Sequence, residues 1–98
     1  PPAVTARREL VEEAGQEAAD WRELGFMHSS PGIFTEVVYL YLARRLTPTS
    51  IGHEREEVIE IHWLPLTQAL QWCVDGTISD AKTLIGLFRA MALLEAEG

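Results

Sequence analysis

The chain of 98 residues has little of what defines several protein classes. It holds one cysteine, Cys73, so an internal disulfide is impossible, and this favours a cytoplasmic location. Its 8 Lys and Arg residues stand against 15 Asp and Glu residues, a formal net charge of −7. That balance argues against nucleic acid as a partner, because phosphate backbones are bound by clusters of Lys and Arg. No apolar run reaches the roughly 18 residues that a membrane span needs, so we expect no membrane partner.

The composition that remains is that of an ordinary globular domain, with 47% hydrophobic and 23% charged residues. Hydrophobic periodicity, turn residues and capping signals divide the chain into six expected elements. They are a helix over 3–16, strands over 21–28, 34–45 and 58–64, a helix over 67–74, and a helix from Ser79 or Asp80 to about Glu95. This order predicts a mixed α/β arrangement within one domain.

An acidic cluster ends the first expected helix, in the segment Arg8-Glu-Leu-Val-Glu-Glu-Ala-Gly15. Glu9, Glu12 and Glu13 are three or four residues apart, so a helix places them along one side. Like charges at this spacing cost about 0.2–0.5 kcal/mol per pair, and only Arg8, four residues before Glu12, offsets that locally. A hard divalent cation would offset it more fully. The competing interpretation is a solvated acidic helix face.

The order of residues in this segment resembles the second half of the Nudix box, G-x5-E-x7-R-E-U-x-E-E-x-G-U, where U is a bulky aliphatic residue. Six positions match at the right spacings: Arg8, Glu9, Leu10, Glu12, Glu13 and Gly15. Gln16 departs from the last U position. The earlier Glu of the box would lie one residue before Pro1, and its opening Gly further upstream. The resemblance therefore implies that residues 1–98 are the C-terminal part of a single Nudix hydrolase domain.

Membership of this family would imply part of the Nudix α/β/α sandwich, a mixed sheet with flanking helices, whose N-terminal strands are missing from the sequence. It would also imply a Mg²⁺ or Mn²⁺ site with Glu9 and Glu13 as principal ligands and Glu12 as a ligand or bridge. Arg8 would take a catalytic role by orienting these carboxylates through charge-assisted hydrogen bonds.

A second acidic cluster, His53-Glu-Arg-Glu-Glu-Val-Ile-Glu60, runs into the third expected strand, where Glu60 is expected to be a surface residue. In the Nudix branch that cleaves ADP-ribose and related nucleoside diphosphate sugars, an acidic loop at this place supplies a further metal ligand and often the general base. Two registers are open: one selects Glu54 and Glu56, and the other selects Glu57. All three are candidate catalytic residues, with a solvated loop as the competing interpretation.

The loop Ser30-Pro-Gly-Ile-Phe-Thr-Glu36 resembles the substrate loop of the same branch, in which a Pro follows the box by about fifteen residues and a Glu comes after it. Pro31 is sixteen residues after Gly15. By this resemblance Pro31, Gly32 and Glu36 bind substrate, although Ser-Pro-Gly is also common turn chemistry. Residues 75–83 resemble the turn that leads into the last helix of that branch.

The expected reaction is therefore hydrolysis of the pyrophosphate bond of ADP-ribose, giving AMP and ribose 5-phosphate, by a protein that forms a homodimer. We expect the 98 residues alone to be inactive or nearly so, while still binding divalent metal weakly. Two alternatives remain at this stage. One is a Nudix hydrolase for another nucleotide sugar or a dinucleoside polyphosphate. The other is a Nudix-like module that binds ADP-ribose without cleaving it, which the three intact glutamates Glu9, Glu12 and Glu13 disfavour.

Overall fold

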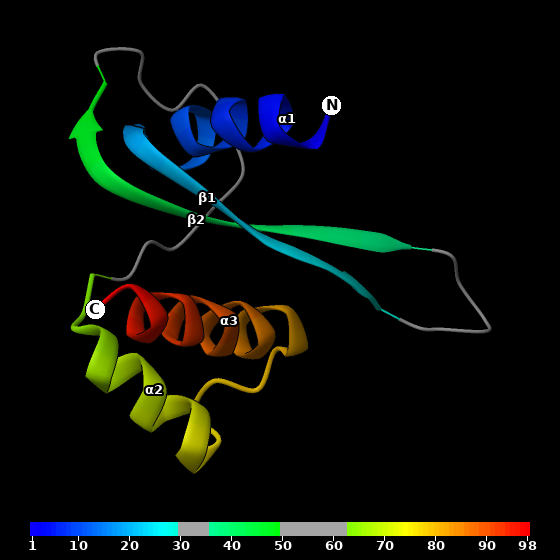
Figure 1. Ribbon diagram of the computed structural model, residues 1–98, viewed down its shortest axis with the longest axis vertical. Helices are drawn as coiled ribbons and strands as arrows, with labels where there is room; N and C mark the ends of the chain where they lie inside the picture. Colours follow the sequence, from blue (N-terminus) through cyan, green and yellow to red (C-terminus); the bar gives the residue numbers. More distant parts are fainter. Residues whose placement is uncertain (30–35, 50–62) are drawn as a thin grey trace. The chain divides into compact units, whose positions relative to one another are not determined.

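The computed structural model describes residues 1–29, 36–49 and 63–98 (Figure 1). Its elements are α1 (Pro2–Glu9), the π-helix η1 (Leu10–Ala14), β1 (Gln16–His28), β2 (Val37–Pro48), α2 (Leu66–Asp75) and α3 (Ala81–Glu97). The mixed α/β arrangement and five of the six expected elements are confirmed. Most of the sixth, the strand over 58–64, lies outside the described residues. Trp63 and Leu64, at its end, belong to no strand, and Pro65 removes a backbone donor and restricts the residue before it.

The chain divides into two compact units. Within the described residues, unit 1 consists of 1–22 and 43–49, and unit 2 consists of 23–29, 36–42 and 63–98. Unit 1 therefore contains α1, η1 and the adjoining ends of the two strands. Unit 2 contains the other ends of the strands together with α2 and α3.

The helix that opens unit 1 starts at Pro2, whose missing N–H is no loss in a first turn. It continues as α-helix to Glu9 and then widens into the π-helical turn η1. Gly15 ends it with φ of 65°, in the left-handed region that glycine adopts without strain. The expected stop at Gly15 is confirmed, and the expected uniform helix over 3–16 is corrected by the π-helical turn.

Within the described residues, β1 and β2 pair as a two-stranded antiparallel sheet, and Figure 1 shows them running side by side. Ser29 N–H donates to the Glu36 carbonyl at one end, and Thr49 N–H donates to the Gly15 carbonyl at the other. The interval from Gly15 to Ser29 is one residue longer than that from Glu36 to Thr49, so β1 carries one extra residue. Gly25, with φ of 80°, has the left-handed backbone found at such a β-bulge.

Strand β1 begins five residues before the predicted strand over 21–28. Residues 16–20 contain no β-branched side chain, and strand propensity therefore gave no signal there. Half-buried and exposed residues nevertheless alternate from Gln16 to Asp20, as a strand with one covered face requires. Pairing with β2 thus extends the strand beyond what local preference supports.

In unit 2, α2 and α3 lie next to each other (Figure 1). Gly76, with φ of 87°, ends α2, and the Asp75 carboxylate accepts hydrogen bonds from the Thr77 N–H and hydroxyl. The Asp80 carboxylate caps α3 by accepting from the Thr83 N–H at 2.9 Å. Of the two capping residues that the sequence offered, Ser79 and Asp80, the structure selects Asp80.

The core of the described residues is small and consists of Met27, Ala69 and Ala90. Several large apolar side chains stay exposed, among them Trp63 at 69% and Phe88 at 67%. In the described ranges, no helix is long and apolar enough to cross a membrane. Much apolar surface of these residues is therefore available for further contacts.

Candidate functional site

The acidic cluster spans the junction of α1 and η1. Glu9 is the last residue of α1, while Glu12 and Glu13 belong to the π-helical turn. All three side chains belong to half-buried residues. A single π-helical turn within a helix is uncommon and is found frequently at functional sites. The three carboxyl groups therefore lie at a local irregularity of the helix.

Arg8 is paired with one of these carboxylates. Its Nε lies 3.8 Å from Oε1 of Glu12, four residues later. This confirms the predicted i,i+4 pair, but the Arg8 side chain is 60% exposed. Such a pair contributes at most about 1 kcal/mol to stability. It joins two successive turns of the helix at the start of the acidic turn.

Backbone hydrogen bonds fix the end of the acidic turn. The Gly15 N–H donates to the Val11 carbonyl at 3.0 Å, which closes the turn that carries Glu12 and Glu13. The Gly15 carbonyl accepts from the Thr49 N–H at 2.9 Å, one residue after β2 ends. The acids thus stand on a segment tied to the sheet within unit 1.

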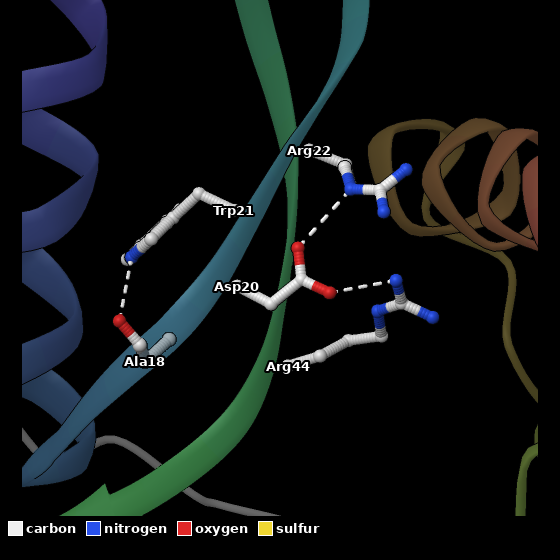
Figure 2. A network of polar contacts seen from close by, with 5 residues as sticks. All are labelled: Ala18, Asp20, Trp21, Arg22 and Arg44. Carbon is white, nitrogen blue, oxygen red and sulfur yellow. Dashed lines mark hydrogen bonds and ion pairs between the residues drawn. The ribbon is translucent and has the colours of Figure 1, made fainter.

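Side-chain contacts also connect α1 to β1. The guanidinium carbon of Arg7 lies 5.1 Å from the centre of the Trp21 ring, within the range of a cation–π interaction. The Trp21 indole donates in turn to the Ala18 carbonyl at 3.1 Å, which limits rotation of the ring (Figure 2). The helix next to the acidic turn therefore has a defined contact with the strand that follows it.

A polar network occupies the other side of the same strand. Figure 2 shows the Asp20 carboxylate between two arginines, with Trp21 pointing away from it. Arg44 Nη2 donates to one carboxylate oxygen at 2.7 Å, and Arg22 Nε donates to the other at 3.1 Å. The Asp20 side chain is only 19% exposed. This charged network joins β1 to β2 within unit 1.

The titration of Asp20 reflects this environment. Desolvation acts to raise the pKa of its carboxyl group, but the hydrogen bonds and positive charges of Arg22 and Arg44 together outweigh it. The pKa of Asp20 is therefore held below its ordinary value. The carboxylate stays ionised at neutral pH and holds both guanidinium groups.

The glutamate carboxylates of the acidic turn suit a hard divalent cation, since Mg²⁺ and Mn²⁺ prefer carboxylate oxygens as ligands. The described residues alone, however, contain no group of three or more His, Cys, Asp or Glu side chains placed to hold a metal ion. Within these residues, Glu9, Glu12 and Glu13 therefore make no complete metal site by themselves. Their assignment as metal ligands stays a prediction.

The remaining predicted site residues are described only in part. Glu36 immediately precedes β2 and is exposed, and its carbonyl accepts the Ser29 N–H at 3.4 Å. The others lie outside the described residues: Pro31, Gly32, Glu54, Glu56 and Glu57. The substrate-binding and general-base predictions therefore stay predictions.

The sequence interpretation missed Asp20 and its two arginines. Asp20 and Arg22 are two residues apart and so share a face of β1, a signal that becomes readable once the strand is known to start at Gln16. Arg44 is 24 residues from Asp20, and no local pattern marks it as their partner. Only the pairing of the strands brings these residues together.

Comparisons with known proteins give the family of the chain. The family described as “NUDIX domain” matches residues 1–84. A GDP-mannose pyrophosphatase of Klebsiella pneumoniae subsp. pneumoniae is 41% identical over 87 residues, covering 86% of this chain and 44% of the relative. A methanol dehydrogenase activator of Bacillus methanolicus is 36% identical over 88 residues, covering 88% of this chain and 48% of the relative.

Among solved structures, an ADP compounds hydrolase is similar, with a TM-score of 0.80 and 27% identity over 96% of this chain and 51% of its own. The chain thus belongs to the Nudix family, and its fold is part of the Nudix fold. It spans about half the length of the curated relatives it matches. Both the predicted family and the predicted partial fold are confirmed.

Proposed function

We propose that the protein containing this chain hydrolyses the pyrophosphate bond of a nucleoside diphosphate sugar with the help of a divalent metal ion. The reaction adds water across one phosphorus–oxygen bond and releases a nucleoside monophosphate and a sugar phosphate. Membership of the Nudix family supports the reaction class. Relatives named as GDP-mannose pyrophosphatases and a similar structure named as an ADP compounds hydrolase support the substrate class.

The observation that carries the proposal is the half-buried acidic turn. Its three glutamates stand on a short helical segment that the Gly15 hydrogen bonds close at one end, with Arg8 paired to Glu12. The chemical obstacle to the reaction is the approach of water to a phosphorus surrounded by negative oxygens. A helical segment that carries three glutamates is suited to supplying part of a cation's ligand set, which the described residues alone do not complete.

In this proposal Glu9 and Glu13 are the principal metal ligands, and Glu12 is a ligand or bridge. A bound divalent metal supplies charge neutralisation on the pyrophosphate and a lowered pKa of the attacking water. Arg8 limits the positions of the Glu12 carboxylate through their ion pair. Mg²⁺ is the first candidate and Mn²⁺ the second, since both take carboxylate oxygens.

Two further groups complete the proposal. One of Glu54, Glu56 and Glu57 accepts a proton from the attacking water as general base. Glu36, with Pro31 and Gly32, contacts the substrate. A cytoplasmic homodimer is proposed as the working form of the protein.

ADP-ribose is the substrate expected from the resemblance of the loop at Ser30–Glu36. GDP-mannose is the competing substrate, because it stands in the name of relatives that are 34–41% identical. Both are nucleoside diphosphates linked to a sugar, so the proposed metal chemistry is the same for each. The two candidate substrates differ in their nucleobase and their sugar, so the assay has to compare substrates that differ in both.

The test is an assay of the full-length protein with Mg²⁺ or Mn²⁺ and a panel of ADP-ribose, ADP-glucose, GDP-mannose and a diadenosine polyphosphate. Products are separated by chromatography. We expect a nucleoside monophosphate and a sugar phosphate from at least one sugar substrate, with the activity lost on chelation and restored by added metal. Binding of ADP-ribose with no turnover of any substrate in the panel would identify the non-catalytic alternative and refute the proposal.

A further inference from the structure

We propose that Arg89, in the middle of α3, is a positioning residue for Glu36. It would act by holding the end of β1 that pairs with the residue Glu36. The inference rests on the proposed function, since Glu36 is assigned to the substrate there. All the residues involved lie in unit 2.

Arg89 binds the backbone of the strand directly. Its Nη1 donates to the carbonyls of Leu24 and Phe26, each at 2.9 Å. Carbonyls two residues apart in a strand point to the same edge, so one nitrogen with two N–H groups can satisfy both. Hydrogen bonds from a charged donor are about twice as strong as those between neutral groups. This contact spans more than sixty residues of sequence and ties α3 to β1.

The strand is shaped to receive the guanidinium group. Gly25, between the two acceptors, has φ of 80°, and a Cβ atom built on it would lie 3.3 Å from Arg89 Nη1. A side chain at this position would therefore be strained by the backbone and would crowd the arginine. Gly25 therefore leaves room for the guanidinium group of Arg89, which binds the carbonyls on either side of it.

Near Glu36 this support matters because the hydrogen bond that joins Ser29 to Glu36 is long, although Met27, two residues before Ser29, is buried. The hydrogen bond from Ser29 N–H to the Glu36 carbonyl measures 3.4 Å, longer than the usual range. The ring of Phe26 also contacts His28, with centroids 5.7 Å apart in a T-shaped arrangement, and Tyr39, with centroids 6.2 Å apart in a tilted one. Since Arg89 fixes Leu24 and Phe26 just before this end, it limits how far Ser29 and Glu36 can move.

The test compares Arg89→Met with Arg89→Lys in the full-length protein. The two side chains are unbranched and similar in length, but only lysine keeps a charged donor for the two carbonyls. We expect Arg89→Met to raise KM about five- to tenfold with kcat within about twofold, and Arg89→Lys to raise KM less than about threefold. Gly25→Ala keeps the arginine but crowds its guanidinium group, and it should also raise KM.

A double-mutant cycle with Glu36→Gln separates positioning from general destabilisation. If Arg89 acts through Glu36, Arg89→Met raises KM less in the Glu36→Gln background than in the wild type. Multiplicative effects, or a fall in kcat at unchanged KM, would overturn the proposal.

Amide hydrogen exchange at Ser29 provides a readout that needs no activity. We expect faster exchange in Arg89→Met and nearly wild-type exchange in Arg89→Lys. Equal rates in the wild type and both variants would refute the positioning role. If the wild type cleaves no nucleoside diphosphate sugar, the proposed function fails, and the exchange comparison still decides whether Arg89 holds this end of the strand.

Discussion

The two units differ in what their contacts are made of. In unit 1, charged side chains contact each other: Asp20 binds Arg22 and Arg44, and Arg8 pairs with Glu12. In unit 2, the long-range polar contact runs from Arg89 to two backbone carbonyls, and the small core of Met27, Ala69 and Ala90 lies there. Contacts between two ionised side chains respond to pH and salt, whereas contacts with neutral carbonyls and apolar packing respond much less.

Unit 2 also has an apolar groove of about 460 Å³ between α2 and α3, lined by Leu70, Cys73, Val74, Phe88, Met91, Ala92 and Glu95. The buried core residues and the paired helices give this unit a packing role beside the proposed substrate contact of Glu36. Unit 1 carries the proposed metal ligands of the acidic turn, and the Asp20 network joins its two strands. The comparison predicts that substitutions in the acidic turn affect turnover and that those in the Asp20 network affect the pH dependence of stability. Substitutions in the core and the helix cap of unit 2 should affect stability.

The largest expected effect is on activity and comes from Glu13→Gln in unit 1. It removes a proposed metal ligand, and we expect kcat to fall on the order of 100- to 1000-fold, because metal stabilisation of transition-state charge contributes several kcal/mol. Steady-state kinetics with saturating Mg²⁺ would measure it. The matched control is Glu17→Gln, an exposed residue of β1, which should leave kcat unchanged. Wild-type turnover by Glu13→Gln would contradict the role of the acidic turn.

Met27→Ala in unit 2 should instead change stability. Met27 is 8% exposed, and truncation of a buried Met leaves a cavity that costs about 2–3 kcal/mol in the free energy of unfolding. Denaturant unfolding monitored by circular dichroism would measure the difference. Met91→Ala, at the half-buried wall of the groove, is the same substitution in a less enclosed place and should cost less. An equal cost at both positions would show that burial in this core does not decide stability.

Asp20→Asn should show the pH dependence that unit 1 predicts. Since the folded-state pKa of Asp20 is lowered, its ionised form stabilises the fold above the unfolded-state pKa, near 3.8, and that stabilisation is lost as pH falls through the lower folded-state pKa. We expect the variant to melt about 2–5 °C below wild type at pH 7. Thermal melts from pH 7 to pH 2 should show this gap closing in acid. A constant gap would assign the effect to packing.

The smallest effect should come from Asp80→Ala, which removes the cap of α3 in unit 2. The Asp80 carboxylate accepts from the backbone N–H and the hydroxyl of Thr83, each at 2.9 Å. We expect a decrease in melting temperature of about 1–3 °C without a change in KM. Ser79→Ala is the matched control and should have no effect. A loss of stability in Ser79→Ala equal to that in Asp80→Ala would contradict the assignment of the cap.

Much of the fold was predictable because its local signals are strong. The stops at Gly15 and Gly76 rest on the left-handed backbone of glycine, and the cap at Asp80 rests on carboxylate chemistry. The early start of β1 at Gln16 was not predictable, since its first residues have little strand preference. The π-helical turn at Leu10–Ala14 was not predictable either, because periodicity does not distinguish it from one more α-helical turn.

The sequence by itself determined the family of this protein, because six residues match the Nudix box within one short segment. Their spacing along the chain can be read without the structure. It also determined the order of the elements, since apolar periodicity and turn residues are local properties. Only the tertiary structure decided which distant residues meet: Asp20 with Arg44, and Arg89 with the carbonyls on either side of Gly25. The reason is that strand register and the docking of a helix bring these residues together, and neither is encoded by the residues next to them.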